Sequence, residues 1–394
     1  MKKLLVFSHK EVWKSKDSPI GWATDGGFVF HMMAIGTLFE QIELVVPQGV
    51  ACNKGEVVFK DGQLQISPIK LPKNISGIKR KLFVLLWGVW NIRFLTKKIK
   101  KADIVHVPIP SDFGTIGMLL TKWLGKPLFI RHCGNWLAPK TAAEQFWKNF
   151  MIKHAGNHVL ALATGGGEQL PTQANTAIKW IFSSSLMENE LAELAQRAQS
   201  KNSNGTLKLV SVARQIKRKG TDKTILAIAE LPNQNIHFDV VGDGQDLNYF
   251  KQLTKELKLE DRVHFHGKLN NTGVLNVLLQ ADIFCFPTQS SEGFPKAVIE
   301  AMACGLPVIT NPVSVLPNLV GGSSSGVILK EGSPKELATV IQEFMTNTKK
   351  RTNFSSNALD TASQYSLEKW ADLIAQELTN EFKIDFKRKR KLIK

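Results

Sequence analysis

Two glutamates lie in the segment SSEGFPKAVIEAMACGLPVIT, in the second half of the chain. Glu292 and Glu300 are separated by seven residues. The preceding apolar run, Ile283–Phe286, predicts a strand, and a helix is expected to begin near Phe294 or Pro295 because proline suits the first helical position. Glu292 would then lie in the loop before this helix, and Glu300 in its second turn.

Both carboxylates can face one ligand at the end of the strand, because helical side chains tilt toward the helix N-terminus. Carboxylates accept hydrogen bonds from sugar hydroxyls, so one can bind a ribose and the other a second sugar. The free N–H groups and partial positive charge of the helix N-terminus suit a diphosphate. Alternatively, the glutamates only favour the helix dipole and solvent, and composition does not decide between these interpretations.

Two cations flank a loop in the segment LVSVARQIKRKG. Arg214 and Lys219 come directly after the predicted strand Leu207–Ala213. Cations at the carboxyl end of a strand can neutralise a leaving diphosphate, as a metal ion does in other enzymes. The alternative is a solvated basic loop, which is how we interpret Lys217 and Arg218.

In the first half, Gly26 and Gly27 open a predicted helix after the first strand, and glycines let the backbone approach a phosphate. His132 follows the strand Leu128–Arg131 and is expected at the same edge of the sheet. His106 lies within the strand sequence IVHV and is interpreted as structural.

Several site types are not present in the sequence. There is no Asp-x-Asp pair for a divalent metal and no Walker A loop, and Gly242-Asp243-Gly244 lacks the third glycine of a dinucleotide fingerprint. We therefore expect no metal and no cofactor. The four cysteines are far apart and form no CxxC pair, which favours a reducing, cytoplasmic location.

Short β-branched strands alternate with helical patterns in both halves, which predicts parallel sheets with crossover helices. One of the predicted helices is Pro334–Thr346. The predicted strands are Leu4–Phe7, Ile42–Val46, Ile104–Val107, Leu128–Arg131 and Val159–Ala163 in the first half, and Leu207–Ala213, Ile236–Val241, Val263–His266, Ile283–Phe286 and Pro307–Thr310 in the second. Such doubly wound α/β domains bind ligands at the carboxyl ends of their strands, in a cleft between the domains. A polar segment, Ala198–Gly205, is the expected linker. The predicted divisions are a domain over 1–200, a domain over 206–365, a helix over 366–382 and a basic tail over 383–394.

The net charge of +17 is concentrated in two regions. Nine basic residues and no acid lie between Lys73 and Lys101, and six basic residues lie in the last eight positions. The first region surrounds the apolar run Leu82–Trp90, a pattern typical of helices that lie on anionic membranes. The alternative is a buried helix with solvated ends. The run is about half the length of a bilayer span, and nucleic-acid-binding motifs are absent, so peripheral contact with the inner face of a membrane is expected.

The chain resembles the family-4, or group 1, glycosyltransferases of GT-B fold. The resemblance runs through VSVARQIKRKG, FDVVGDGQDL, DRVHFHGKL and ADIFCFPTQSSEGFPKAVIEAMACGLPVIT, and continues to the helix around Trp370. It is weaker in the first half, at DGG, ADIVHV and LFIRHCG. One departure is that Ala213-Arg214 replaces the usual glycine-arginine dipeptide.

The resemblance implies a role for each matching residue. Arg214 and Lys219 match the diphosphate-binding pair, Glu300 the ribose ligand, and Glu292 the residue that faces the transferred sugar. Phe294 and Pro295 match residues at the phosphates, and Gly26 and Gly27 match the glycine loop of the first domain. His132 matches the histidine beside the donor sugar, and Gly242 lies in the donor-binding GDG segment.

The implied activity is a metal-independent, retaining transfer of a hexose from a nucleotide diphosphate sugar. The donor would bind the second domain and a saccharide or lipid-linked saccharide the first, in cell-surface polysaccharide or glycolipid synthesis. The last helix would cross back to the first domain. Two alternatives are a GT-B sugar-nucleotide epimerase and a non-catalytic membrane-associated scaffold.

Overall fold

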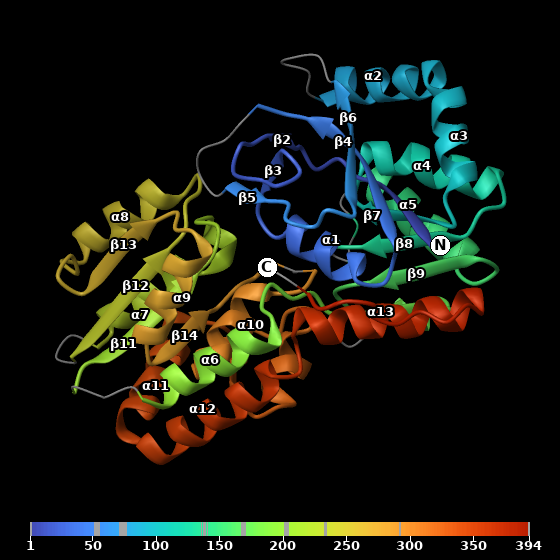
Figure 1. Ribbon diagram of the computed structural model, residues 1–394. Helices are drawn as coiled ribbons and strands as arrows, with labels where there is room; N and C mark the ends of the chain where they lie inside the picture. Colours follow the sequence, from blue (N-terminus) through green and yellow to red (C-terminus); the bar gives the residue numbers. More distant parts are fainter. Residues whose placement is uncertain are drawn as a thin grey trace. The chain divides into compact units, whose positions relative to one another are not determined.

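The computed structural model describes residues 2–50, 56–70, 77–134, 136, 139, 141–166, 171–200, 205–231, 235–290 and 293–392. The chain forms two compact units (Figure 1). The first unit comprises Met1–Ser185 and Leu367–Lys394, and the second comprises Leu186–Ser366.

The first unit is built on a seven-stranded sheet of order β10-β9-β8-β7-β1-β4-β6, in which every neighbouring pair is parallel. The five strands that the sequence predicts here are confirmed. The edge strands β6 and β10 were not predicted, because β6 contains serine, glutamine and proline and β10 is only three residues long. The strand bounds are β1 Lys3–Phe7, β4 Gln41–Gln48, β6 Leu64–Lys70, β7 Ile104–Ile109, β8 Leu128–His132, β9 Val159–Ala163 and β10 Ile178–Trp180.

Helices cover both faces of this sheet. One face packs its alternate residues against α2 to α5, in a core that includes Val84, Leu95, Phe113 and Trp147. Helices α1 and α13 contact each other, and α13 contacts β9. A small antiparallel sheet, β2-β3-β5, lies beside the main one. The bounds are α1 Phe28–Gly36, α2 Gly77–Trp90, α3 Ile92–Lys101, α4 Asp112–Trp123, α5 Ala142–His154, α13 Leu367–Phe382, β2 Trp13–Lys14, β3 Trp22–Asp25 and β5 Glu56–Val58.

The second unit has a six-stranded parallel sheet of order β13-β12-β11-β14-β15-β16. Five of these strands were predicted, and β16 is a three-residue edge strand that was not. The strands are β11 Leu207–Val212, β12 Ile236–Val241, β13 Val263–Gly267, β14 Ile283–Phe286, β15 Val308–Thr310 and β16 Gly326–Ile328. The helices are α6 Glu188–Gln199, α7 Thr221–Ala229, α8 Leu247–Glu256, α9 Asn271–Gln280, α10 Lys296–Ala303, α11 Pro334–Thr346 and α12 Thr348–Ala362.

The structure divides the chain earlier than the sequence suggests. The expected linker, Ala198–Gly205, begins inside α6, and residues 201–204 lie outside the described residues. Helix α6 belongs to the second unit because it packs against α9 and α10. The second division falls between Ser366 and Leu367, so helix α13 is part of the first unit.

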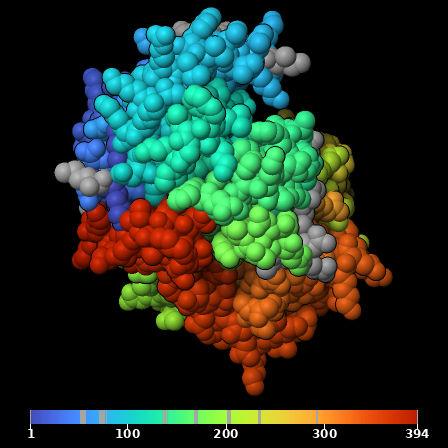
Figure 2. Space-filling model, turned by 90° about the vertical axis from the view of Figure 1, so that its right-hand side faces the viewer, coloured from blue at the N-terminus to red at the C-terminus, as the bar shows by residue number. Residues whose placement is uncertain are grey.

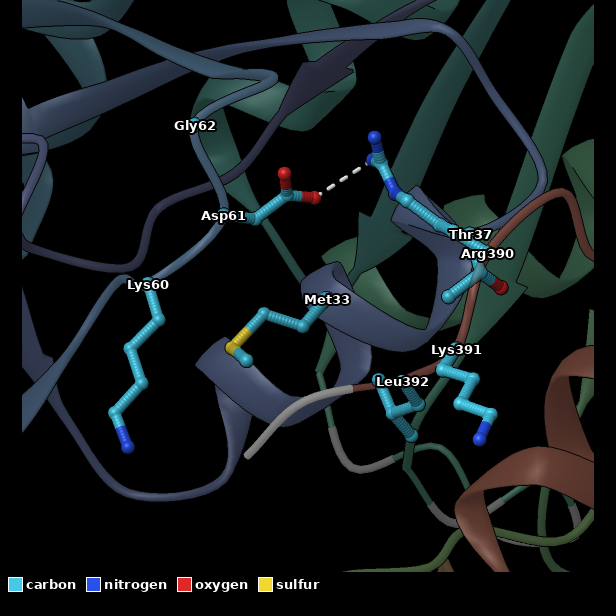
Figure 3. A pocket seen from close by; sticks show the side chains of 8 residues that line it. All are labelled: Met33, Thr37, Lys60, Asp61, Gly62, Arg390, Lys391 and Leu392. Carbon is cyan, nitrogen blue, oxygen red and sulfur yellow. Dashed lines mark hydrogen bonds and ion pairs between the residues drawn. The ribbon is translucent and has the colours of Figure 1, made fainter.

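The basic C-terminal tail is folded onto the first unit. The Phe386 ring packs on Phe39 at 5.5 Å between centroids and is 6% exposed. Arg390 forms an ion pair of 2.8 Å with Asp61, beside a cavity of about 200 Å³ that Met33, Lys60 and Leu392 help to line (Figure 3). Much of the charge of the predicted basic tail is therefore paired with acids of the first unit.

Acids far away in the sequence account for the pairing of the tail. Arg388 makes a bidentate contact of 2.7 and 2.9 Å with Asp372, and Lys389 pairs with Glu40.

Across the described ranges, every helix is too short or too polar to cross a bilayer.

Candidate functional site

The loop between β11 and α7 carries the two predicted cations. It includes a single 3₁₀ turn, Lys217–Lys219, followed by Gly220 in the left-handed conformation at φ 83°. The Arg214 side chain is exposed, and its guanidinium makes no hydrogen bond or ion pair with any described residue. Lys219 is partly buried, with Nζ 5.6 Å from the centre of the Phe286 ring.

The loop lowers the pKa of Lys219. Burial lowers it to about 8, and the nearby charges of Arg214 and Arg218 act in the same direction. A dianionic ligand in the loop would oppose all three effects, because an opposite charge favours the ammonium form. The loop is therefore a site where negative charge is favoured.

Gln215 holds this loop in place, and the sequence analysis did not identify it. It is fully buried. Its Nε2 donates to the carbonyl oxygens of Ala213 (2.9 Å) and Val241 (3.0 Å), and its Oε1 accepts from the Thr221 hydroxyl (2.9 Å). Its backbone N–H donates to the Asp243 carbonyl. One side chain thus joins the ends of β11 and β12 to the start of α7.

Gly242 contributes by its lack of a side chain. It lies directly after β12 at φ 122°, and a Cβ there would be 1.9 Å from the carbonyl oxygen of Ala213. No other residue allows the two loops to approach so closely. Gly242 was predicted to bind the donor, and its packing shows how it shapes the loop that carries Arg214.

Helix α10 begins beside the same strand ends. Pro295 is its N-cap and Lys296 its first residue, so the helix starts just after the predicted position. In the described residues no side chain caps this end and no acid lies in its first turn, so the N-terminal dipole favours an anion. Glu300 is half-buried in the second turn, whereas Glu292 lies outside the described residues.

The first-unit glycines begin another helix. They follow β3 of the small sheet rather than β1. Gly26 is exposed at φ 66°, and Gly27 is the N-cap of α1, which has no side-chain cap among the described residues and no acid in its first turn. This helix start also favours an anion.

His132 ends strand β8 and is 3% exposed. Burial lowers its pKa to about 4, so the ring is neutral near pH 7. The ring packs edge-on against Trp136 at 5.6 Å between centroids, and within the described residues Nδ1 has no hydrogen-bond partner. His132 can therefore act as a hydrogen-bonding group but not as a cation.

The structure brings some predicted residues together in the second unit and places others in the first unit. In the second unit, β11 lies between β12 and β14, so the loops that follow these strands meet at one edge of the sheet. These loops and α10 carry Arg214, Lys219, Gly242, Phe294, Pro295 and Glu300. The others that are described, Gly26, Gly27 and His132, belong to the first unit. In the part of the chain that the structure describes, no group of three or more His, Cys, Asp or Glu is placed to hold a metal ion.

Comparison with known proteins identifies the unit that carries this loop. Residues 193–361 match the family described as glycosyl transferases group 1. This part of the chain is a group 1 glycosyltransferase domain. The predicted family is thus confirmed, and the matched range includes the cationic loop and α10.

Two curated relatives from Escherichia coli K12 match part of this chain. The lipopolysaccharide glucosyltransferase WaaG is 31% identical over 42% of this chain and 46% of its own. The putative colanic acid biosynthesis glycosyltransferase WcaL is 32% identical over 35% of this chain and 36% of its own. The chain spans between 36% and 65% of the length of the first relatives that it matches.

The likeness to a solved structure extends over both units of this chain. Anabaena Alr3699/HepE in complex with UDP is 18% identical, with a TM-score of 0.68 over 96% of this chain and 100% of the other. Together with the two parallel sheets, this likeness confirms the predicted GT-B fold.

Proposed function

We propose that this chain transfers a sugar from a nucleotide diphosphate sugar to a saccharide or lipid-linked saccharide, with retention of configuration and without a metal ion. The observation that carries the proposal is the cationic loop after β11. Arg214 has no acidic partner among the described residues, and the pKa of Lys219 is lowered by burial and by neighbouring positive charge. Both groups gain stability when a diphosphate binds.

The cations act on the leaving group. As the bond between the anomeric carbon and the diphosphate oxygen breaks, its electron pair passes to the diphosphate. Arg214, Lys219 and the N–H groups at the start of α10 stabilise that added charge. The acceptor hydroxyl attacks from the face that the diphosphate leaves, and its proton passes to a diphosphate oxygen. Configuration is thereby retained and no enzyme nucleophile is required.

The relatives suggest which substrates to test first. HepE was solved with UDP, and WaaG is named as a lipopolysaccharide glucosyltransferase. We therefore take UDP-glucose as the first donor and a bacterial cell-surface glycan precursor as the first acceptor class. Glu300 and Glu292 are proposed to bind the ribose and the transferred sugar, and Gly26, Gly27 and His132 are proposed to contact the donor.

The test is transfer with a panel of UDP-, GDP- and ADP-sugars in the presence of a chelator. The expected result is acceptor-dependent release of nucleotide and a product with the donor's anomeric configuration. Lys219→Ala should lower turnover about a hundredfold, as expected when one electrostatic stabiliser is lost. A strict requirement for magnesium or manganese would refute metal independence. Release of an isomerised sugar nucleotide without acceptor would indicate an epimerase.

We further propose that helix α2 holds the protein on an anionic membrane. Its outer face carries apolar side chains at helical spacing that are between 42% and 76% exposed, namely Leu82, Leu85, Leu86, Val89 and Trp90. The inner face packs on the first unit, where Val84 is 4% exposed. The α2–α3 segment, light blue in Figure 2, lies at the surface of the molecule. These exposed apolar side chains disfavour the alternative of a buried helix with solvated ends.

Basic residues surround this apolar face. Two of them are neutralised, because Arg80 pairs with Asp112 and Lys98 pairs with Glu43. The others that are described are exposed, namely Lys79, Lys81, Arg93, Lys97, Lys100 and Lys101. Each such cation near an anionic leaflet, which in cells is the cytoplasmic one, contributes about 1 kcal/mol. This supports peripheral attachment on the cytoplasmic side.

Flotation with phosphatidylglycerol-containing vesicles tests the attachment. The double variant Leu85→Ser/Trp90→Ser should bind at least about tenfold more weakly, because each exposed apolar side chain contributes on the order of 1 kcal/mol when it enters the interface. The matched control is Lys387→Ala/Lys391→Ala in the tail, which should bind like the parent. Equal binding by all three proteins would remove helix α2 as the docking surface.

A further inference from the structure

Arg131 is a buried cation outside the proposed transfer machinery. It lies in β8 and is 3% exposed. Its neighbours Leu128 and Ile130 belong to the core beneath α2 to α5. Successive side chains of a strand point to opposite faces, so Arg131 points to the face opposite Ile130, where its guanidinium meets α13.

The Arg131 guanidinium makes no hydrogen bond or ion pair with any described residue, and its Nε is buried without a partner. A buried charge is strongly disfavoured unless it is paired and hydrogen-bonded. Arg131 therefore points to an anion that binds beside it.

Trp370 supplies a second donor. Its ring, on α13, lies 4.9 Å from the guanidinium carbon of Arg131. Trp370 is fully buried, and within the described ranges its Nε1 has no hydrogen-bond partner. The other ring against it, His31 at 4.7 Å between centroids, already bonds to the Ser184 carbonyl oxygen at 2.9 Å. Two adjacent N–H groups thus lack acceptors in the described part of the chain.

His106 supplies an acceptor on the same face of the sheet. In the parallel pairing of β7 with β8, His106 lies opposite Phe129, which is two residues before Arg131 in β8. His106 and Arg131 therefore lie on the same face of the sheet, two strand positions apart. The Nδ1 of His106 lies 3.0 Å from the Phe129 carbonyl oxygen. A carbonyl only accepts, so Nδ1 carries the proton and Nε2 of the neutral ring is an acceptor. Nε2 is buried and has no partner among the described residues.

We propose that Arg131, Trp370 and His106 form a buried site for a small oxyanion that carries a proton, such as dihydrogen phosphate or hydrogencarbonate. Its oxygens accept hydrogen bonds from Arg131 and Trp370, and its hydroxyl donates to His106. Sulfate has the size of phosphate but no hydroxyl, and chloride has neither oxygens nor a hydroxyl. Both should bind less well, because they leave the His106 acceptor unpaired.

Binding at this site would stabilise the first unit. Trp370 belongs to α13 and Arg131 to the sheet, so one anion would join the C-terminal helix to β8. A ligand that binds only the folded state raises its stability with concentration. This effect does not depend on the proposed transfer reaction.

The experiment uses the full chain in the Arg214→Ala/Lys219→Ala background, so that anions do not bind the cationic loop. Inorganic phosphate, sulfate and chloride are titrated at constant ionic strength and mildly acid pH, with calorimetry and thermal unfolding as readouts. Phosphate should bind saturably and raise the unfolding temperature. Sulfate should bind about tenfold more weakly, the loss expected for one hydrogen bond.

Two variants locate the binding. Arg131→Met removes the charge at similar volume and should weaken phosphate binding by at least about tenfold. Trp370→Phe keeps a buried ring, removes only the N–H donor and should weaken binding by up to about tenfold, which keeps the test available if Arg131→Met does not fold. No saturable response, unchanged binding in both variants, or sulfate binding as tight as phosphate binding would overturn the proposal.

Discussion

The lowered pKa of Lys219 predicts how activity changes with pH. Its pKa is lowered from 10.5 to about 8, first by burial and then by Arg214 and Arg218. With a pKa near 8, the ammonium is charged in about nine molecules of ten at pH 7 and in about one of ten at pH 9. Because kcat/KM reports ionisations of the free enzyme, it should fall about tenfold over this interval.

Replacing Lys219 with arginine separates this group from others that titrate in the same range. A guanidinium stays charged up to about pH 12, so the fall in kcat/KM should disappear below about pH 10. The absolute rate can be lower, because a guanidinium presents its donors differently from an ammonium. In the parent enzyme, kcat at saturating donor should vary less than kcat/KM, because the bound diphosphate raises the pKa of the lysine.

The assay is nucleotide release at constant ionic strength, with donor varied at each pH. Lys217→Ala is the matched control: Lys217 is exposed in the same 3₁₀ turn, with its Nζ 3.9 Å from the centre of the Tyr249 ring. It should keep the parent's pH profile. A flat kcat/KM between pH 7 and pH 9, or the same fall in Lys219→Arg, would show that Lys219 does not provide the charge at the leaving group.

Three further predictions concern stability. Gln215→Leu leaves the Ala213 carbonyl oxygen and the buried Thr221 hydroxyl without their Gln215 partner, and leaves the Val241 carbonyl oxygen with only its bond from the Ala213 N–H. It should cost about 3 kcal/mol in urea unfolding, and a loss below about 1 kcal/mol would contradict its role in holding the loop. Gly242→Ala should prevent stable folding because its Cβ would overlap the Ala213 carbonyl. In the control Gly26→Ala, the Cβ faces open space, and the variant should lose only about 1–2 kcal/mol of stability through its positive φ. Similar melting temperatures for the two variants would refute the overlap. Phe386→Ala should cost about 3 kcal/mol, measured by calorimetry, because the ring is buried against Phe39; no change would mean that the tail does not pack stably.

The sequence predicted the central strands because each is a short run of buried, β-branched residues with a turn after it. Strands β12 and β14 have the predicted bounds, and α11 does as well. The missed edge strands are short or contain polar residues and proline, so local sequence does not distinguish them from loops. Their pairing partner, not their composition, makes them strands.

Long-range partners explain the other differences. In the sequence, Gln215 is one more polar residue in a basic loop. It is buried because the end of β12 and the start of α7 pack against it. In the sequence, the tail is an isolated cationic segment. Asp61 and Glu40 lie far from it along the chain and pair with it only in the folded structure. A polar residue at the end of a predicted strand weakly indicates a structural role. The sequence does not show which atoms its side chain will bind in the folded protein.

The geometry of the cationic loop also bears on the proposed metal independence. A leaving diphosphate needs positive charge that is already in place when the bond breaks, since moving it there would add to the barrier. Gln215 fixes the loop by bonds to two backbone carbonyl oxygens and the Thr221 hydroxyl, not to acids, and Arg214 keeps its charge without an acidic partner among the described residues. A glutamate in the position of Gln215 could still accept from Thr221, but it could not donate to the two carbonyl oxygens, and its charge would reduce the field at the phosphates. Gln215→Glu should therefore weaken UDP binding even where the protein stays folded, and unchanged UDP affinity in a folded variant would show that the field of the loop does not set donor binding.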